Sequence, residues 1–305
     1  MSWVRGPLRG LVVLAAVGCT AAGSEGEALR RGDEAFARGD LPEALAEYRL
    51  SLAQGADGVD GFLRVAHAYA SSGRVTEARD YYQRAVEIEP ELADLAASDL
   101  LRVARAAIGR QDGIAAAAAV EAAMELRPGV SLTGISLPLA RHFARNGRYG
   151  QALPFFQKAL RETDSDPDVV FEMALTHEEL GDCRRALVFF EQIRGEVTSA
   201  QRSEVDWNIG NCSAELGTEA KAEEDLDEAL RLFRTTIELG EPRNRLAQAW
   251  FEIGEILALR GECSAAAAAF DQVSRQDLPG GFIVDRARAR VDEIRFFRRG
   301  GEAPC

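Results

Sequence analysis

Few residues of this sequence are of the types that do chemistry: it has three histidines, His67, His142 and His177, and five cysteines. Two glutamates follow His177, but the second histidine of the zinc-binding pattern H-E-x-x-H is missing. No two cysteines have the C-x-x-C spacing of zinc ligands. The sequence has neither a Gly-rich phosphate loop nor a G-x-S-x-G turn. It therefore predicts no enzyme activity, no metal site and no cofactor, and the histidines are interpreted as packing or groove residues.

The first 18 residues are predicted to be a signal peptide. Arg5 and Arg9 form a short positive region before an apolar run over residues 11–18. That run is far shorter than the roughly 20 residues of a membrane-spanning helix. It ends at Ala16-Val17-Gly18-Cys19, which resembles the lipobox of bacterial lipoproteins with Ala16 in place of the usual leucine.

The resemblance implies cleavage before Cys19, acylation of Cys19 and anchoring in a membrane by several acyl chains. Residues 19–27 are then the lipidated cysteine and a small, polar tether to the fold. Thr20 stands where an aspartate would signal retention in the inner membrane, so the outer membrane is favoured. The alternative is an ordinary signal peptide cleaved near Ala22, with Cys19 incidental.

The charge balance narrows the classes of partner. The chain has 36 Lys and Arg against 49 Asp and Glu, a net charge of −13. Loss of residues 1–18 removes two arginines and no acid, which gives −13 − 2 = −15. An acidic chain gains no counterion release on nucleic acid, and an anionic lipid surface is an equally poor partner. The acyl anchor is then the predicted contact with the membrane, and protein is the predicted class of partner.

The strongest pattern is an internal repeat, with units that start near residues 25, 59, 97, 133, 167, 203 and 247. The eighth position of each unit is small: Gly32, Ala66, Ala104, Ala140, Ala174, Gly210 and Gly254. The twentieth is always alanine: Ala44, Ala78, Ala116, Ala152, Ala186, Ala222 and Ala266. The twenty-fourth is large: Tyr48, Tyr82, Val120, Phe156, Phe190, Leu226 and Phe270. Small residues let two helices cross closely, and the large one fills the gap to the next unit.

These positions resemble the tetratricopeptide repeat (TPR), a helical hairpin whose family repeat is 34 residues. The resemblance implies an all-α fold, a right-handed superhelical solenoid of about seven hairpins over residues 28–280. In the sixth unit the second helix is predicted to be long, from Glu219 to Leu239, because apolar residues stay on one face. Residues 282–299 are predicted to form a helix that caps the array, within a C-terminal segment of residues 281–305.

The four remaining cysteines are predicted to form two disulfides. Cys183 and Cys263 both start the second helix of a hairpin. Cys212 is expected late in the next first helix, and Cys305 lies past the capping helix. Adjacent antiparallel helices place the start of one beside the end of the next, so Cys183 should meet Cys212 and Cys263 should meet Cys305. Such bonds persist in an envelope compartment. The alternative is four buried free thiols.

In this family the first helices line a concave groove. The fifth position, which usually faces it, is apolar throughout: Leu29, Leu63, Leu101, Leu137, Phe171, Trp207 and Phe251. The ninth is polar and mixed, and includes Arg105 and Arg141. The Lys and Asn pair of chaperone-tail clamps is missing. An apolar stripe suits an amphipathic helix or extended peptide, but neighbouring helices could equally cover the fifth position.

The predicted function is a lipid-anchored scaffold that recruits or assembles an envelope complex through this groove. The chain resembles the TPR lipoproteins of Gram-negative bacteria that serve outer-membrane barrel assembly, pilus and secretin assembly, or docking of peptidoglycan enzymes. A periplasmic small-ligand or glycan binder is the alternative, favoured by a closed pocket beside Phe171, Trp207 and Phe251. An unrecognised enzyme would require a cluster of buried acids with perturbed pKa values.

Overall fold

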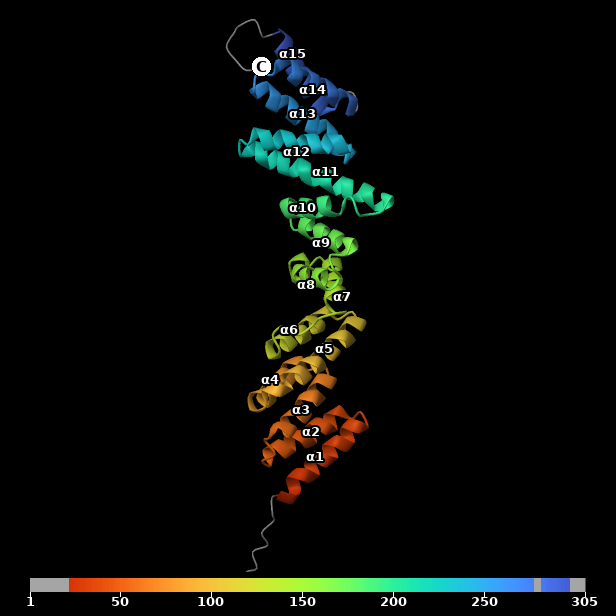
Figure 1. Ribbon diagram of the computed structural model, residues 1–305, viewed down its shortest axis with the longest axis vertical. Coiled ribbons are helices and arrows are strands. Elements are labelled where there is room, and N and C mark those ends of the chain that lie inside the picture. Colours follow the sequence, from red (N-terminus) through yellow and green to blue (C-terminus); the bar gives the residue numbers. More distant parts are fainter. Residues whose placement is uncertain (1–21, 277–280, 297–304) are drawn as a thin grey trace, which may run out of the picture. The chain divides into compact units, whose positions relative to one another are not determined.

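The computed structural model describes residues 22–276, 281–296 and 305. All regular structure in these residues is helical, as predicted. The chain divides into two compact units, one up to Ser131 and one from Leu132. In each, helices that are neighbours in the sequence pack in pairs, and Figure 1 shows these pairs labelled.

The first unit contains three hairpins. Its helices are α1 (Ala22–Ala37), α2 (Leu41–Ala53), α3 (Val59–Ser71), α4 (Val75–Ile88), α5 (Ala93–Gly109) and α6 (Gly113–Leu126), with a 3-10 turn at Pro90–Leu92. Helix α1 begins at Ala22, within the segment 19–27 that the sequence predicts to be a tether. The alanines and glutamates there favour helix, so residues 22–27 of that segment are helical and continue into the first hairpin.

The second unit contains four hairpins and a last single helix. Its helices are α7 (Ser136–Arg145), α8 (Tyr149–Glu162), α9 (Pro167–Glu179), α10 (Cys183–Ile193), α11 (Ser199–Ala222), α12 (Leu226–Leu239), α13 (Arg243–Leu259), α14 (Cys263–Gln276) and α15 (Phe282–Phe296). Odd-numbered helices up to α13 are the first helices of hairpins, and even-numbered ones are the second helices.

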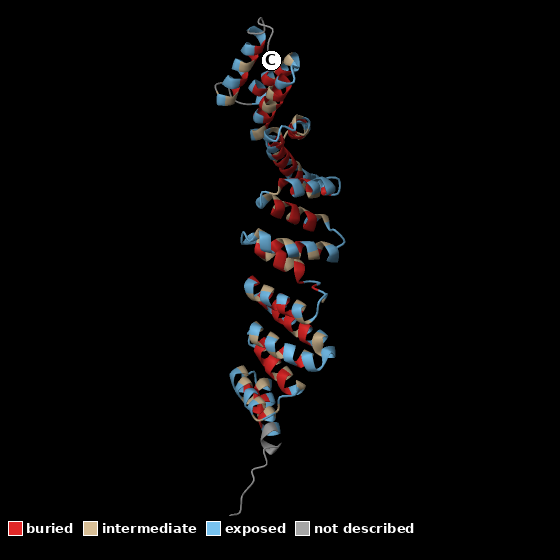
Figure 2. Cartoon of the chain, turned by 90° about the vertical axis from the view of Figure 1, so that its left-hand side faces the viewer, coloured by how far each residue is buried: buried red, intermediate tan, exposed pale blue. Residues whose placement is uncertain are grey.

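The hairpins close where the repeat pattern predicts. A Cβ on Gly32 would lie 2.5 Å from the ring of Tyr48, and one on Gly254 would lie 2.6 Å from the ring of Phe270. The alanine at the twentieth position is fully buried in every unit except the sixth: Ala44, Ala78, Ala116, Ala152, Ala186 and Ala266. Figure 2 shows this burial as stripes along the inward faces of the helices. Small residues therefore set the close approach of each helix pair.

The sixth unit departs from the prediction. The long helix is the first one, α11 with 24 residues, and Ala222 is exposed at its end. Gly217 faces the ring of Phe233, and Ala229 is fully buried. The small, alanine and aromatic positions are thus Gly217, Ala229 and Phe233, each seven residues after the predicted one.

Backbone conformation confirms this corrected register. The fifteenth position of every unit has a positive φ: Gly39, Gly73, Gln111, Gly147, Gly181, Glu224 and Gly261. A unit that starts at residue 210 places Glu224 there, with φ 65°. Asp225 then caps α12 by accepting a hydrogen bond from the backbone N–H of Glu228. The predicted helix Glu219–Leu239 is therefore broken at residues 223–225.

Helix α15 covers the end of the second unit. It packs on α14 and α13 with one apolar face, formed by Val284, Ala287, Val291 and Ile294. Arg290 Nε on this helix lies 2.7 Å from Glu255 Oε1 on α13. Most of the opposite face is charged and exposed, which is what a terminal cap requires. The helix is described as far as Phe296, so the last part of the predicted 282–299 helix lies outside the described residues.

Candidate functional site

Polar contacts join successive first helices within each unit. In the first unit, Arg64 on α3 reaches Asp33 on α1, and Asp99 on α5 reaches His67 on α3. In the second unit, the pairs are Arg141 with Glu172, Asn211 with Glu178, Arg245 with Glu215, and Lys221 with Glu252. In each unit, we call the surface that carries these contacts the first-helix face of that unit. It is polar and paired, in contrast to the continuous apolar stripe that the fifth position predicts.

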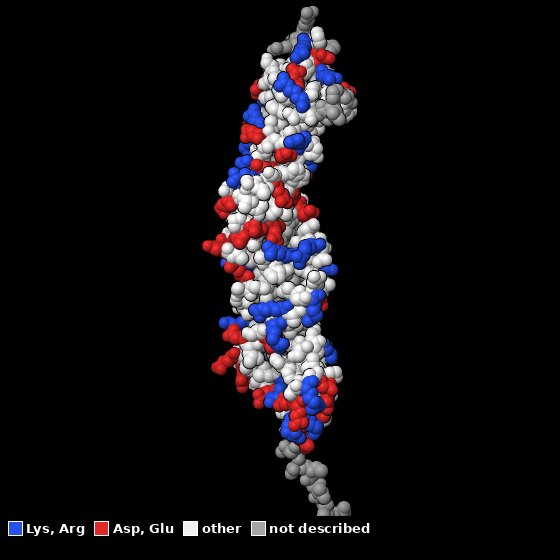
Figure 3. Space-filling model, turned by 90° about the vertical axis from the view of Figure 1, so that its right-hand side faces the viewer, with Lys and Arg blue, Asp and Glu red and all other residues white. Residues whose placement is uncertain are grey.

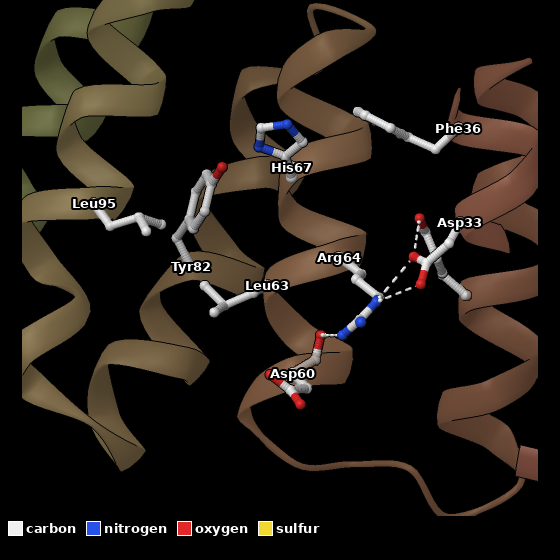
Figure 4. Close-up of a pocket in the computed structure, with 9 residues that line it drawn as sticks. Asp33, Phe36, Asp60, Leu63, Arg64, His67, Tyr82 and Leu95 are labelled. Atoms are coloured by element: carbon white, nitrogen blue, oxygen red, sulfur yellow. Dashed lines mark hydrogen bonds and ion pairs between the residues drawn. The ribbon is translucent and has the colours of Figure 1, made fainter. Parts of the chain in front are cut away.

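A pocket of about 340 Å³ opens on this face in the first unit. Its lining comes from α1, α3 and α5 and includes Phe36, Leu63 and the exposed Leu95, together with the buried rings of Tyr48 and Tyr82 from the second helices α2 and α4. Arg64 Nε lies 3.0 Å from Asp33 Oδ1, as the dashed lines in Figure 4 mark. The pocket thus offers apolar walls with a positive and a negative group fixed between them.

Tyrosine hydroxyls tie the floor of this pocket to the charged groups. Tyr48 donates a hydrogen bond of 2.8 Å to Asp33 Oδ1. Burial and this carboxylate both raise the pKa of the Tyr48 hydroxyl well above its usual range. The phenol therefore stays protonated, and it orients Asp33 towards Arg64.

Asp99 is the centre of a second cluster beside the pocket. It accepts hydrogen bonds from Tyr82 and His67, and Arg102 Nη2 lies 2.9 Å from its Oδ1. Burial raises the pKa of Asp99, but the hydrogen bonds from His67, Tyr82 and Arg102 outweigh it and hold that pKa well below the usual range. Asp99 is therefore an ionised group that fixes the ring of His67 at the edge of the pocket.

A similar pocket of about 390 Å³ lies on the first-helix face of the second unit. Ala144, Phe156, Leu175 and Thr176 provide most of its apolar surface, and Arg141, Arg145, Tyr149, Glu172 and Glu179 its polar groups. Arg141 binds Glu172 in a bidentate pair, with contacts of 2.9 Å and 2.6 Å. This pair raises the pKa of the Arg141 guanidinium, chiefly through the hydrogen bonds to Glu172.

The fifth-position residues divide into three groups. Leu29, Leu63, Leu137 and Phe171 are half-buried, and Leu63 lines the pocket of the first unit. Leu101 and Phe251 are only 4% and 2% exposed, so their assignment to a groove is wrong. Trp207 is 42% exposed, but with the corrected register it lies before the start of its unit.

The burial of Phe251 has a clear cause. Its ring lies 5.4 Å from the ring of Phe270 in α14. The guanidinium of Arg286 in α15 lies over the same ring, 4.4 Å from its centroid. The capping helix therefore covers the fifth position of the seventh unit, as the alternative interpretation of these residues allows.

Of the two predicted groove arginines, Arg141 lines the pocket of the second unit. Arg105 is an exposed residue of α5 and lines neither of the pockets described above. Sequence reasoning missed Arg64, Asp99, Glu172 and Arg145, and it assigned Tyr48 a packing role alone. A signal was present in part: Asp33 with Arg64 and Arg141 with Glu172 are both opposite charges 31 residues apart, a spacing close to the repeat length.

The histidines are packing or pocket residues. His67 lines the pocket of the first unit. His142 lies 5.8 Å from the ring of Phe143, and His177 is buried with its ring stacked 5.6 Å from that of Phe189. Within the part of the chain that the structure describes, no group of three or more His, Cys, Asp or Glu residues could hold a metal ion.

The four cysteines after Cys19 lie in the two pairs that helix adjacency predicts. Cys183 at the start of α10 is bonded to Cys212, with Cα atoms 5.0 Å apart. Cys263 at the start of α14 is bonded to Cys305, with Cα atoms 5.5 Å apart. Cys212 lies in the middle of α11, however, because that helix is longer than predicted. The second bond ties the C-terminal residue to the hairpin that α15 covers.

The predicted lipidation site, Cys19, lies outside the described residues. So do the signal peptide of residues 1–18 and residues 19–21 of the tether. None of the described helices is both long enough and apolar enough to cross a membrane.

Comparison with known proteins identifies the repeat. Models described as tetratricopeptide repeat match residues 29–93, 139–168 and 214–281, together more than half of the chain. The chain therefore belongs to the tetratricopeptide repeat family. Residues 94–138 and 169–213, the second of which contains the extension of α11, lie outside these matches.

Individual relatives are more distant. Cellulose synthase operon protein C of Xanthomonas axonopodis pv. citri (strain 306) is 31% identical over 161 residues, which are 52% of this chain but 10% of that protein. A crystal structure of YrrB, a TPR protein with an unusual peptide-binding site, is 16% identical, with a TM-score of 0.33 and coverage of 79% of this chain and 97% of that chain. The structure of Pseudomonas aeruginosa pilF is 14% identical, with a TM-score of 0.30 and coverage of 88% and 98%.

Proposed function

We propose that this chain is a lipid-anchored scaffold of the bacterial cell envelope that binds partner polypeptides on the first-helix faces of its two units. The observation that carries the proposal is the pair of open pockets on those faces, each with apolar walls and fixed charged groups. Such a mixture suits a polypeptide, whose side chains offer apolar surface and opposite charge within a few residues. TPR proteins are in general binding modules rather than enzymes.

Two further features support the envelope part of the proposal. The two disulfides suit a compartment where such bonds persist. The lipobox-like run before Cys19 supplies an anchor. The glycan-binding alternative depended on one pocket beside Phe171, Trp207 and Phe251, and Phe251 lies in the core instead.

The anchor is tested by Cys19→Ser. Without the acylated cysteine, we expect the protein to move from the membrane fraction to the soluble envelope fraction, or to accumulate uncleaved. Fractionation followed by intact-mass measurement shows which occurs. Cys305→Ser is the matched control, because it removes a cysteine of the Cys263–Cys305 disulfide and leaves the lipobox-like run unchanged, so the protein should stay membrane-bound. Detergent-dependent membrane association of Cys19→Ser would refute the anchor.

The binding face is tested by photo-crosslinking in cells. A photoreactive residue in place of Leu95, which is 53% exposed on the wall of the first pocket, should form adducts with a polypeptide. The same residue in place of Ile114, 62% exposed on the second helix α6, should not. Equal adducts at both positions, or adducts only at Ile114, would show that the first-helix face is not the binding surface.

A further inference from the structure

The hairpin α7–α8 differs in charge from the rest of the chain. Over residues 136–162 it has five Lys and Arg (Arg141, Arg145, Arg148, Lys158 and Arg161) against the single acid Glu162, in a chain of net charge −13. On the face shown in Figure 3, positive and negative side chains are mostly interspersed. A concentration of positive charge on one hairpin therefore needs a local explanation.

Arg145 is the cation of this hairpin that is placed to bind a ligand. It is exposed, it lines the pocket of the second unit, and it forms no ion pair within the described residues. The other arginine of the pocket, Arg141, is neutralised by Glu172. The remaining acid of the pocket, Glu179, interacts with Tyr149. Burial is the main cause that raises the pKa of the Tyr149 hydroxyl, and this carboxylate is the second. Arg145 is thus the unpaired positive group of the pocket.

Trp207 does not line this pocket, but the register of α11 against α9 places it on the next first helix at a similar level. Gln201 Nε2 on α11 lies 2.9 Å from Asp168 Oδ1 on α9, and Asn211 Nδ2 lies 3.0 Å from Glu178 Oε1. Both pairs are 33 residues apart, so the two helices run in the same direction and in register over this stretch. Trp207 is one turn before Asn211 on the same side of α11, and Leu175 is one turn before Glu178 on α9. In this register residue 207 is opposite residue 174, so Trp207 is within one residue of the level of Leu175, which is part of the pocket wall.

The exposure of Trp207 is a property of this chain and not of the repeat. Helix α11 starts at Ser199, whereas the corrected sixth unit starts at residue 210. Trp207 belongs to the helical extension that precedes the unit, and the other hairpins have no counterpart of it. A tryptophan left 42% exposed next to an apolar pocket is typical of a binding surface, where its large rigid ring is an effective anchor.

We infer that the α7–α9–α11 surface of the second unit binds an extended polypeptide segment that contains an acidic residue close to a large apolar residue. The carboxylate pairs with Arg145 at one end of the pocket. The apolar side chain lies over Leu175 and against the indole of Trp207 at the other end. This inference rests on the proposed function and adds the chemistry of the partner. The chain as a whole is acidic and would repel an acidic segment, so the positive charge of Arg145 is what allows such a segment to bind here.

The test is selection of random twelve-residue peptides, displayed on phage, against the immobilised full chain. The selected peptides should share Asp or Glu within a few residues of Trp, Phe or Leu. Arg145→Glu should weaken their binding at least about tenfold, because it turns attraction into repulsion. Trp207→Ala should weaken it about thirtyfold, the effect of removing an aromatic anchor. Replacement of the peptide acid by lysine should restore binding to Arg145→Glu.

Two matched variants control for general effects of charge and of apolar surface. Arg148→Glu changes an exposed arginine of the same hairpin that does not line the pocket, and Val188→Ala trims an exposed apolar residue of α10. Both should bind the peptides as the parent does. Peptides that bind all four variants equally would overturn this inference and leave the proposed scaffold function standing. Failure to select any peptide would overturn both.

Discussion

Phe251→Ala is expected to lower the free energy of unfolding by about 3–5 kcal/mol, the usual loss when a buried aromatic is truncated in a packed core. The ring is 2% exposed and contacts both the ring of Phe270 and the guanidinium of Arg286. Its removal leaves a cavity under the capping helix, and α15 loses both an apolar contact and the cation–π contact of Arg286. Thermal and urea unfolding of the full chain, followed by circular dichroism, measure the change.

Trp207→Ala is the comparison within the same experiment. Its side chain is largely outside the core, so the loss of stability should be below about 1 kcal/mol, as for most surface changes. The two aromatic residues should thus separate cleanly: one variant melts early, and the other melts normally but loses peptide binding. A near-native melting temperature for Phe251→Ala would mean that α15 does not cover this ring.

These two residues show why the groove was only partly predictable. Both are aromatic residues assigned to the fifth position of a repeat, and the sequence pattern treats them alike. What separates them is tertiary context: a capping helix covers one, and a helical extension displaces the other from the repeat. A periodic pattern reports which side of a helix a residue is on, but not which neighbour arrives at that side.

The hairpins themselves were predictable because their closure depends on residue size. Glycine or alanine opposite a large residue is a steric requirement, and it leaves a mark in the sequence at a fixed spacing. The turn between helices is less visible. Five hairpins place glycine at the left-handed residue of the turn, but Gln111 and Glu224 adopt that conformation without it. Without a glycine at residue 224, the apolar period of α12 merged with the end of α11 and hid the break.

The polar contacts of the first-helix face could not be read from composition. Arg64 reaches Asp33, and Glu172 reaches Arg141, across two successive hairpins. The spacing of 31 residues between the opposite charges is a partial signal of these pairs, but whether the side chains meet depends on how the hairpins stack. The disulfide pairs were easier to predict from the sequence. The ends of neighbouring antiparallel helices must lie close together, and the chain has few cysteines that could pair in another way.

Gly210→Ala is expected to destabilise the protein by about 3 kcal/mol or more, at the upper end of the effect of overpacking. A Cβ at this position would lie 1.9 Å from the backbone oxygen of Glu241 and 3.2 Å from Cδ of Pro242. Thr236 also donates a hydrogen bond of 2.9 Å to the Gly210 carbonyl, so the backbone of α11 is held from this side. Either α11 or the connection between α12 and α13 must move, and the gain of about 1 kcal/mol from alanine in a helix is too small to compensate.

Gly150→Ala is the matched control, since Gly150 lies in helix α8 and a Cβ at this position would meet no neighbouring side chain or loop within 4 Å. It should raise stability by up to about 1 kcal/mol, so the two glycine variants should shift the urea midpoint in opposite directions. The contrast also explains the misplaced register of the sixth unit. Gly210 is small because the loop at Glu241 crosses it, whereas Gly217 is the glycine that faces the ring of its own hairpin. If Gly210→Ala proved as stable as Gly150→Ala, that loop would not lie against α11 and the corrected register would lose one of its supports.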